Sequence, residues 1–290
     1  MKKYFGKFNS ETDIQNAINN GELTKPYVAM VRDMVFGKYE LDYNSKSVVR
    51  DWANEPFTVI AKDDGWIGWN QTTGLSPAIE FSYSINGGEW TTLSTTGDAT
   101  FEVSNGDEVK FKAYNERYFG NSFWSNIDYE AKGNIMSLIY GDDFAQYQYE
   151  FPYNTSYNFA NFFYESGFVL QDVSDLYLPA TGLTDYCYDN MFIDTNIEKS
   201  PVIGTQLGFG ETTTLASGCC SNMFKNCSNL NEVHCNYVFS NITAEDYFDD
   251  WMDGVAATGT FYKSALMDGI SAGPWETDSV DGIPTGWEIV

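Results

Sequence analysis

The chain contains an internal repeat, and this repeat constrains the fold more than any other feature of the sequence. The segment TGLTDYCYDNMF (181–192) matches TTLASGCCSNMF (213–224) at an offset of 32 residues, with Thr, Leu, Cys, Asn, Met and Phe in common. A fainter copy, NTSYNFANFF, ends at Phe163, 29 residues before Phe192. Repeats of this length are typical of stacked supersecondary units, each of which needs a neighbour to bury its apolar face.

Within each copy, apolar residues recur every four positions, which predicts one buried stripe on a short helix. The cysteine of each copy then serves as a small apolar residue of a repeating core. The residues expected in this core are Leu183, Cys187, Met191 and Phe192 in one copy and Leu215, Cys219, Met223 and Phe224 in the next.

The second copy belongs to a cysteine-rich stretch, SGCCSNMFKNCSNLNEVHC (217–235), which also holds the only histidine, His234. Zinc ligands usually come in pairs two to four residues apart. Here Cys219 and Cys220 are adjacent, and six residues separate Cys220 from Cys227. We therefore predict buried thiols with no metal and no cofactor, Cys227 turned inward, and His234 on a strand.

Charge is distributed unevenly along the chain. The net charge is −25, which argues against nucleic acid and anionic membranes as partners. Residues 1–50 hold eight basic and six acidic residues, a net of +2, whereas the other 240 hold eight basic and 35 acidic residues, a net of −27. The first fifty residues therefore form a different kind of surface.

The residue pattern of this N-terminal segment (1–50) predicts a short helix in NSETDIQNAINNG, followed by a hairpin of the strands KPYVAMV and YELDYNS. It has too little apolar content for a strong core of its own. We expect it to dock onto another protein through paired strand edges. The docking candidates are Pro26, Tyr27, Val28, Asp42 and Tyr43.

In residues 51–131 the pattern changes to short runs of alternating apolar and polar residues, which predicts short strands. The turns INGGEW and VSNGDEVKF each place Asn-Gly between two alternating runs, a strong hairpin signal. Strands at this spacing predict an antiparallel sandwich. Residues 132–290 then carry the repeats, and the closing GTFYKS and DGIPTGWEIV depart from the repeat pattern, as expected of a C-terminal cap.

Three parts of the chain resemble known families. YLPATGLTDYCYDNMF, TTTLASGCCSNMFKNCSNL and the closing GTFYKS and DGIPTGW resemble the BspA-like leucine-rich repeat proteins of gut Bacteroidetes and their phages. FSYSINGGEWTTL and GDEVKFKAYN resemble the Ig-like sandwich that often precedes such repeats. IQNAINNGELTKPYVAMV is similar to short N-terminal segments of virion proteins in crAss-like and related phages, including head-fibre proteins.

Residues and resemblance together predict a β-rich, multi-domain protein. Its expected parts are an N-terminal helix-plus-hairpin docking segment (1–50), an Ig-like antiparallel β-sandwich (51–131), and a short irregular BspA-like leucine-rich repeat solenoid with a C-terminal cap (132–290). The resemblance implies a capsid-attached virion protein. An acidic, aromatic-rich surface without an export signal fits a phage particle, whose proteins fold in the host cytoplasm and reach the virion surface without a signal peptide.

Catalytic patterns are weak in this sequence, and no catalytic residue is predicted. The carboxylate pairs Asp63–Asp64, Asp142–Asp143 and Asp249–Asp250 are adjacent in the chain, whereas a glycosidase needs two carboxylates facing each other across a cleft. A single histidine leaves little room for a nucleophile triad, and G-x-S-x-G does not occur.

Aromatic residues near predicted loops are candidates for stacking on a sugar ring. We select Trp66, Trp69, Tyr118 and Trp124, although most such aromatics lie in protein cores.

The predicted function is a non-enzymatic phage virion structural protein, a head fibre or decoration protein anchored to other capsid proteins by its first fifty residues. A homo-oligomer, with a trimer favoured, is expected. A glycan-binding adhesin or receptor-binding fibre, facing a host-surface or mucus glycan, is the first alternative. A polysaccharide-degrading enzyme is the second.

Overall fold

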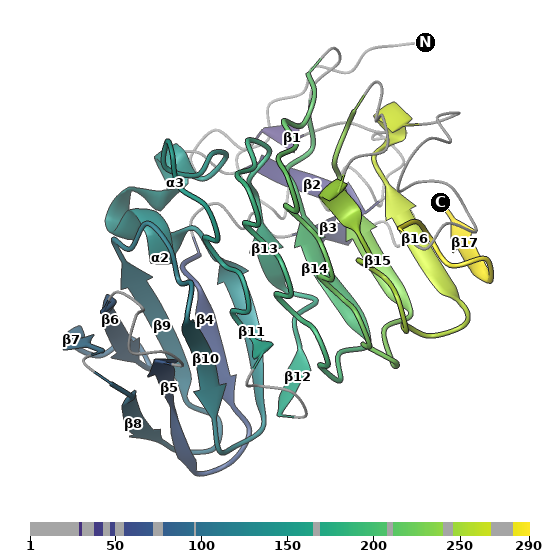
Figure 1. The fold of residues 1–290 in the computed structure, drawn as a ribbon. Coiled ribbons are helices and arrows are strands. Elements are labelled where there is room, and N and C mark those ends of the chain that lie inside the picture. Colours follow the sequence, from purple (N-terminus) through teal and green to yellow (C-terminus); the bar gives the residue numbers. More distant parts are fainter. Residues whose placement is uncertain are drawn as a thin grey trace. The chain divides into compact units, whose positions relative to one another are not determined.

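The computed structural model describes residues 55–71, 78–95, 97–164, 169–207, 211–239, 246–267 and 281–290, together with the backbone of three strands closer to the N-terminus. The chain divides into two compact units, Met1–Glu55 and Pro56–Val290. The second unit is β-rich, with a mixed sheet and a few short helices (Figure 1).

The first unit contains a small antiparallel sheet with strand order β1-β2-β3. Strand β1 (Ala29–Met30) pairs with β2 (Lys38–Asp42), which confirms the predicted hairpin, and β2 pairs with β3 (Ser47–Val49). Asp42 is the last residue of β2. The predicted helix and the docking candidates Pro26, Tyr27, Val28 and Tyr43 lie outside the described residues.

The second unit is built on one long sheet of eleven strands, in the order β17-β16-β15-β14-β13-β11-β4-β9-β6-β7, with β12 beside β11. Its antiparallel part comprises β4 (Thr58–Ala61), β6 (Glu80–Ile85), β7 (Thr91–Ser94), β9 (Glu108–Ala113) and β11 (Tyr129–Asn134). A separate antiparallel sheet has the order β10-β5-β8, and comprises β5 (Gly65–Gln71), β8 (Ala99–Val103) and β10 (Asn121–Ser125).

These two antiparallel sheets pack face to face through aromatic side chains, an arrangement consistent with a β-sandwich. Trp69 of β5 is fully buried, with its ring 4.2 Å from Phe81 of β6 and 5.0 Å from Phe111 of β9. The alternation of buried and partly exposed residues along β9 is what a strand with one core face requires. The INGGEW turn joins the paired strands β6 and β7, as its Asn-Gly predicted. The hairpin predicted at VSNGDEVKF is wrong, because the strands on either side of that turn, β8 and β9, belong to different sheets.

Strand β11 joins the sandwich to the repeats. It pairs antiparallel with β4 on one side and parallel with β12 (Leu170–Asp172) and β13 (Leu176–Leu178) on the other. The boundary predicted between residues 131 and 132 therefore falls inside a strand. The two parts share one sheet and one continuous core.

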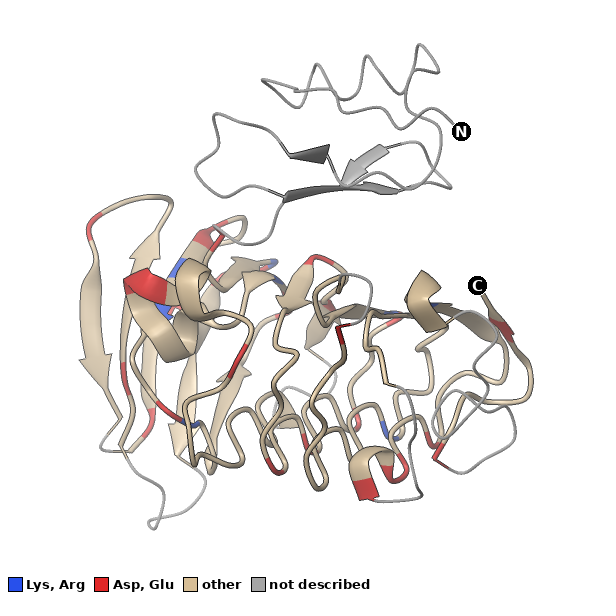
Figure 2. Cartoon of the chain, turned by 90° about the horizontal axis from the view of Figure 1, so that it is seen from above, with Lys and Arg blue, Asp and Glu red and all other residues tan. Residues whose placement is uncertain are grey.

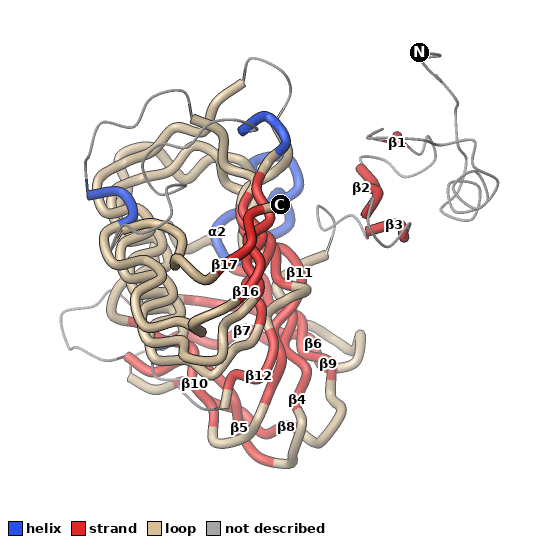
Figure 3. The backbone as a smooth tube through the Cα atoms, turned by 90° about the vertical axis from the view of Figure 1, so that its right-hand side faces the viewer, coloured by secondary structure: helices blue, strands red, loops and turns tan. Residues whose placement is uncertain are grey.

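The remaining strands extend this sheet in parallel. They are β14 (Lys199–Ile203), β15 (Glu232–Cys235), β16 (Gly259–Lys263) and β17 (Trp287–Ile289). The last two belong to the predicted cap, which thus continues the sheet. When the parallel strands are viewed end to end along their stacking direction, they form one wall of the repeat region, and the stacked turns form the opposite wall (Figure 3).

The repeat segments are turns, not the short helices predicted from their four-residue spacing. Tyr186, Asn190 and Asp194 have φ values of 56°, 53° and 59°, in the left-handed region, whereas a helix keeps φ negative throughout. Met191 N–H donates to the carbonyl of Tyr188, three residues earlier, at 3.2 Å. This is the hydrogen bond of a β-turn, whereas an α-helix bonds to the carbonyl four residues earlier. A left-handed residue after each such turn restores the same side-chain direction every four residues, and this spacing imitates a helix.

Backbone hydrogen bonds join each layer of turns to the next. Tyr188 N–H donates to the carbonyl of Cys219 at 2.9 Å, and Phe192 N–H donates to that of Met223 at 2.9 Å. In a helix these groups would bond four residues back along the same segment. The interlayer bonds satisfy buried backbone groups that the turns alone leave unpaired, which explains why neighbouring copies are needed.

The predicted register of the repeats is confirmed by an aromatic column in the core. Phe163, Phe192 and Phe224 stack in successive layers, with ring centroids 5.2 and 5.4 Å apart. Trp251 continues the column, 6.2 Å from Phe224. The repeat pattern in the sequence does not predict this further layer, because a tryptophan replaces the phenylalanine and Trp251 lies 27 residues after Phe224 rather than 32.

The expected core residues occupy that interior. All are buried except Leu215, which is partly buried and packs against the others. Cys227 and Leu230 are also buried.

The short helices lie in the connections between strands. Those after β11 are α2 (Ser137–Tyr140), η2 (Gly141–Asp143) and α3 (Phe144–Tyr147), and those before and after β16 are η4 (Asp246–Phe248) and η5 (Ala265–Met267). Acidic residues recur along the rows of turns in the described part of the chain, and basic residues are few there (Figure 2). The negative charge of the sequence is therefore spread over the body rather than gathered in one place.

Candidate functional site

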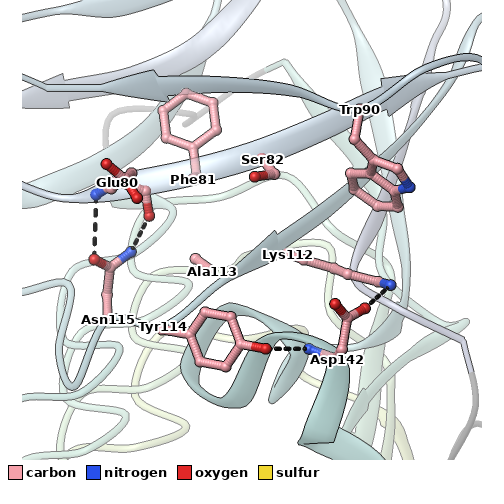
Figure 4. A pocket seen from close by; sticks show the side chains of 9 residues that line it. All are labelled: Glu80, Phe81, Ser82, Trp90, Lys112, Ala113, Tyr114, Asn115 and Asp142. Atoms are coloured by element: carbon pink, nitrogen blue, oxygen red, sulfur yellow. Dashed lines mark hydrogen bonds and ion pairs between the residues drawn. The ribbon is translucent and has the colours of Figure 1, made fainter.

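A pocket of about 390 Å³ lies over strands β6 and β9, on the face of the sheet that is turned away from the sandwich core (Figure 4). Strand alternation places Ser82 and Lys112 on this face, while their neighbours Phe81 and Ala113 are buried. Trp90 precedes β7, Tyr114 follows β9, and Asp142 comes from η2. The pocket thus gathers residues from four separate elements.

Two aromatic rings of this pocket are exposed to solvent. The exposed fraction is 44% for Trp90 and 66% for Tyr114. Both rings are large apolar surfaces that the core does not use. Exposed aromatic side chains in a concave site, beside a few polar groups, are typical of a binding site.

Polar contacts hold these two rings in place. Lys112 Nζ lies 4.8 Å from the centroid of the Trp90 ring, a cation–π contact, and its ammonium pairs with the carboxylate of Asp142. The backbone N–H of Asp142 donates to the hydroxyl of Tyr114 at 3.1 Å. A single chain of interactions therefore runs from Trp90 through Lys112 and Asp142 to Tyr114.

Gly141 gives Tyr114 the space that its ring occupies. Its φ is 52°, and a β-carbon at this position would come within 2.2 Å of the Tyr114 ring. Glycine is required here both for the left-handed backbone and for the close approach of the ring.

The opposite end of the pocket is braced by Asn115. Its amide oxygen accepts the N–H of Glu80 at 3.2 Å, and its amide nitrogen donates to the Glu80 carbonyl at 2.8 Å. The same nitrogen donates to the hydroxyl of Tyr118, which in turn donates to the carbonyl of Leu138. Burial raises the pKa of Tyr118 well above its ordinary value. Its hydroxyl therefore stays protonated and keeps this bridge.

Two of the four predicted ligand contacts require correction. Trp69 and Tyr118 are fully buried, because their rings fill the space between the two sheets and beside the first layer of turns. Tyr118 supports the pocket from below rather than lining it.

The other two predicted ligand contacts, Trp66 and Trp124, are partly buried on β5 and β10. Their ring centroids lie 4.7 Å apart. They pair with each other on the separate three-stranded sheet, away from β6 and β9. The structure therefore brings none of the four predicted residues into the pocket.

The sequence did contain one signal for the pocket that was missed. Trp90 comes two residues after the Asn-Gly-Gly turn and immediately before edge strand β7, whose residues are exposed except for the partly buried Leu93. A tryptophan at an edge position has little core to enter.

The cysteine-rich stretch is part of the core and forms no cation site in the described ranges. All five cysteines are buried free thiols. Burial raises the pKa of Cys227 to about 11 and that of Cys235 to about 12, which leaves these thiols protonated and poor as ligands or nucleophiles. Nowhere in the described part of the chain do three or more His, Cys, Asp or Glu side chains gather as a metal site would require.

His234 lies on β15, as predicted. Its Nε2 is 3.0 Å from a carboxylate oxygen of Glu232, and its ring stacks on Tyr262 at 4.4 Å. These contacts give it a surface hydrogen bond and a stacking partner, with no nucleophile in the arrangement.

The three adjacent carboxylate pairs lie in loops and short helices: Asp63–Asp64 between β4 and β5, Asp142–Asp143 in η2, and Asp249–Asp250 after η4. Burial, together with the charges of Asp281 and Asp246, raises the pKa of Asp249. Of the six, Asp142 is the one that lines the pocket.

Comparisons with protein-family models, curated proteins and solved structures found no match to this chain. Within the described residues, none of the helices has the length and apolar character needed to cross a membrane.

Proposed function

We propose that this chain is a non-enzymatic phage virion structural protein, a capsid-attached head fibre or decoration protein displayed on the virion surface. The first unit attaches it to other capsid proteins, and the second unit is the displayed body. In this proposal the antiparallel part of the body is an Ig-like sandwich, and its parallel part is a short BspA-like leucine-rich repeat solenoid.

The observation that carries this proposal is the separation of the chain into a small N-terminal unit and a large body with different charge. Met1–Glu55 and Pro56–Val290 are distinct compact units. The sequence balance is +2 for residues 1–50 and −27 for the rest. A near-neutral attachment segment approaches an acidic assembly without the long-range repulsion that the body experiences.

The architecture of the body supports a structural role. Its parallel strands and stacked turns are joined by backbone bonds from layer to layer, and its aromatic column runs through successive layers. Such arrays are stiff because each layer is held by both neighbours. A stiff, acidic body suits a protein that projects from a particle.

The test is a chain that begins at Glu55, compared with the full chain for incorporation into phage particles purified from infected cells. The truncated chain is expected to keep its thermal transition within about 2 °C, since the removed unit is compact by itself, yet to be absent from particles. A full chain carrying Trp90→Ala serves as the control and should be incorporated normally. Incorporation of the truncated chain at the normal level would disprove attachment through the first unit.

A homo-oligomer, with a trimer favoured, belongs to the same proposal. Edge strands such as β7 present unpaired backbone groups that a neighbouring copy covers. Sedimentation of the full chain at micromolar concentrations should show a species larger than the monomer, and a single monomeric boundary would count against it.

A glycan-binding adhesin is the second candidate function. The observation that favours it is the pair of exposed aromatic rings in the pocket over β6 and β9.

A further inference from the structure

The Trp90–Tyr114 pocket, which comprises Glu80, Phe81, Ser82, Trp90, Lys112, Ala113, Tyr114, Asn115 and Asp142, is organised before any ligand arrives. Its two exposed rings are fixed by a cation–π contact, an ion pair and a hydrogen bond rather than by burial. Rigid, exposed Trp and Tyr side chains offer a large contact area at a low cost in conformational entropy. Folding of the body does not need these rings to be exposed, so their placement points to a ligand.

The charges in the pocket argue against an anionic ligand. Among the described residues that line it, Lys112 is the one cation, and it is already paired with Asp142. Glu80 lies at the other end, and the body carries a large negative charge. An anionic ligand would be repelled by these carboxylates and would meet no unpaired cation among the described lining residues.

The chemistry of the lining matches a sugar. A pyranose ring presents C–H groups on its faces and hydroxyl groups around its rim. The C–H groups carry partial positive charge and suit the negative face of a Trp or Tyr ring. The hydroxyl groups suit the carboxylates of Glu80 and Asp142, which accept hydrogen bonds strongly.

The size of the pocket limits the ligand to a short saccharide. Small-molecule sites range from about 300 to 1,000 Å³, and this pocket, at about 390 Å³, lies near the lower end. It has room for roughly one or two sugar rings.

We propose that the Trp90–Tyr114 pocket binds a neutral saccharide, with a sugar ring stacked on Trp90 or Tyr114 and its hydroxyl groups bonded to Asp142 and Glu80. This inference rests on the second candidate function, a glycan-binding adhesin, and names the ligand class of its pocket; it does not depend on the attachment of the protein to a virion. On a displayed body, such a site would give the particle affinity for glycans.

The experiment is titration calorimetry of the full chain with maltotriose, cellotriose, mannotriose, lactose and N,N′-diacetylchitobiose, followed by saturation-transfer NMR to identify the sugar protons in contact. At least one of these saccharides is expected to bind, with the strongest saturation on ring C–H protons. Since the ligand is neutral, its affinity should be unchanged between low and high salt.

Variants locate the site. Trp90→Ala is expected to weaken binding at least about tenfold, because buried Trp anchors carry much of the energy of an interface. Trp90→Phe, which keeps an aromatic face, should retain part of it. Tyr153→Ala is the matched control, since Tyr153 is 92% exposed and lies outside the pocket, and it should bind as the original chain does.

The proposal is overturned if none of the five saccharides binds at millimolar concentration, or if Trp90→Ala binds as well as the original chain. Tighter binding of choline or sialyllactose than of every neutral saccharide would also overturn it, because the pocket would then select charge. Particle incorporation is measured separately, so a chain that binds a saccharide but is absent from particles refutes the virion role alone.

Discussion

The substitution Gly218→Ala tests how the stacked turns are held together. Gly218 has a φ of 59° and corresponds to Tyr186 in the preceding layer, at φ 56°. The Tyr186 ring lies against Gly218, where a β-carbon would come within 2.3 Å of it, and its ring centroid is 4.8 Å from that of Tyr157. Alanine therefore both strains the backbone and displaces a stacked ring.

The expected loss follows from these two effects. A left-handed alanine costs about 1 kcal/mol relative to glycine. Loss of a stacked aromatic pair costs about 0.5–1.5 kcal/mol more. The free energy of unfolding should therefore fall by about 1.5–2.5 kcal/mol, which corresponds to a drop of roughly 3–10 °C in the melting temperature for a domain of this size.

Gly87→Ala is the matched control. Gly87 has a φ of 71°, but a β-carbon there meets no atom within 4 Å. This variant should lose only the backbone term of about 1 kcal/mol. Urea unfolding, followed by circular dichroism, measures both variants.

The reasoning is refuted if Gly218→Ala and Gly87→Ala destabilise the protein equally. A double-mutant cycle sharpens the result. In a Tyr186→Ala background the ring is gone, so Gly218→Ala should then cost only about as much as Gly87→Ala.

Three further predictions concern the buried interior. Phe192→Ala removes the middle of the aromatic column and should destabilise the body by about 3–5 kcal/mol in urea unfolding, whereas the exposed Tyr153→Ala should change the free energy of unfolding by less than about 0.5 kcal/mol. Tyr188→Phe deletes a buried hydroxyl for which the described residues provide no hydrogen-bond partner, so the variant should be as stable as the original or more stable; a loss above about 1 kcal/mol would reveal an unrecognised partner. Burial raises the pKa of Cys227 to about 11 and of Cys235 to about 12, above the ordinary value of 9.0. Because the pKa of each thiol is higher in the folded chain than in the unfolded chain, its contribution to the free energy of unfolding is fully present below pH 9 and is lost as the pH rises through 11 to 12. The urea midpoint should therefore fall over that range, and it should fall less in Cys235→Ala.

The sequence by itself determined the repeat register and the hairpin at INGGEW, but not the second predicted hairpin at VSNGDEVKF, whose flanking strands β8 and β9 join different sheets. Equivalent residues such as Phe192 and Phe224 stack because successive layers of a repeat present the same position to each other. The Asn-Gly turn before Trp90 predicted the hairpin of β6 and β7 because few residues other than Asn and Gly accept positive φ at a two-residue turn. These are local or strictly periodic signals, which a single chain displays openly.

Tertiary structure alone decided the conformation of the repeats. A side chain every four residues on one face is compatible with a helix and with a row of turns. The choice depends on whether each backbone N–H bonds within its own segment or to the next layer, as Tyr188 does to Cys219. That bond joins residues 31 positions apart and has no local signature in the sequence.

The pocket and the domain boundary were also decided by the three-dimensional arrangement. Trp90, Lys112 and Asp142 are far apart in the chain and meet only because β9 lies beside β6 and because η2, which comes later in the chain, packs near β9. Composition made Trp69 as good a candidate as Trp90. The two residues differ in the direction of their side chains: Trp69 points into the sandwich and Trp90 points out of it. The sequence does not specify this direction, because alternating residues of a strand point to opposite faces of the sheet and nothing local marks which face is buried.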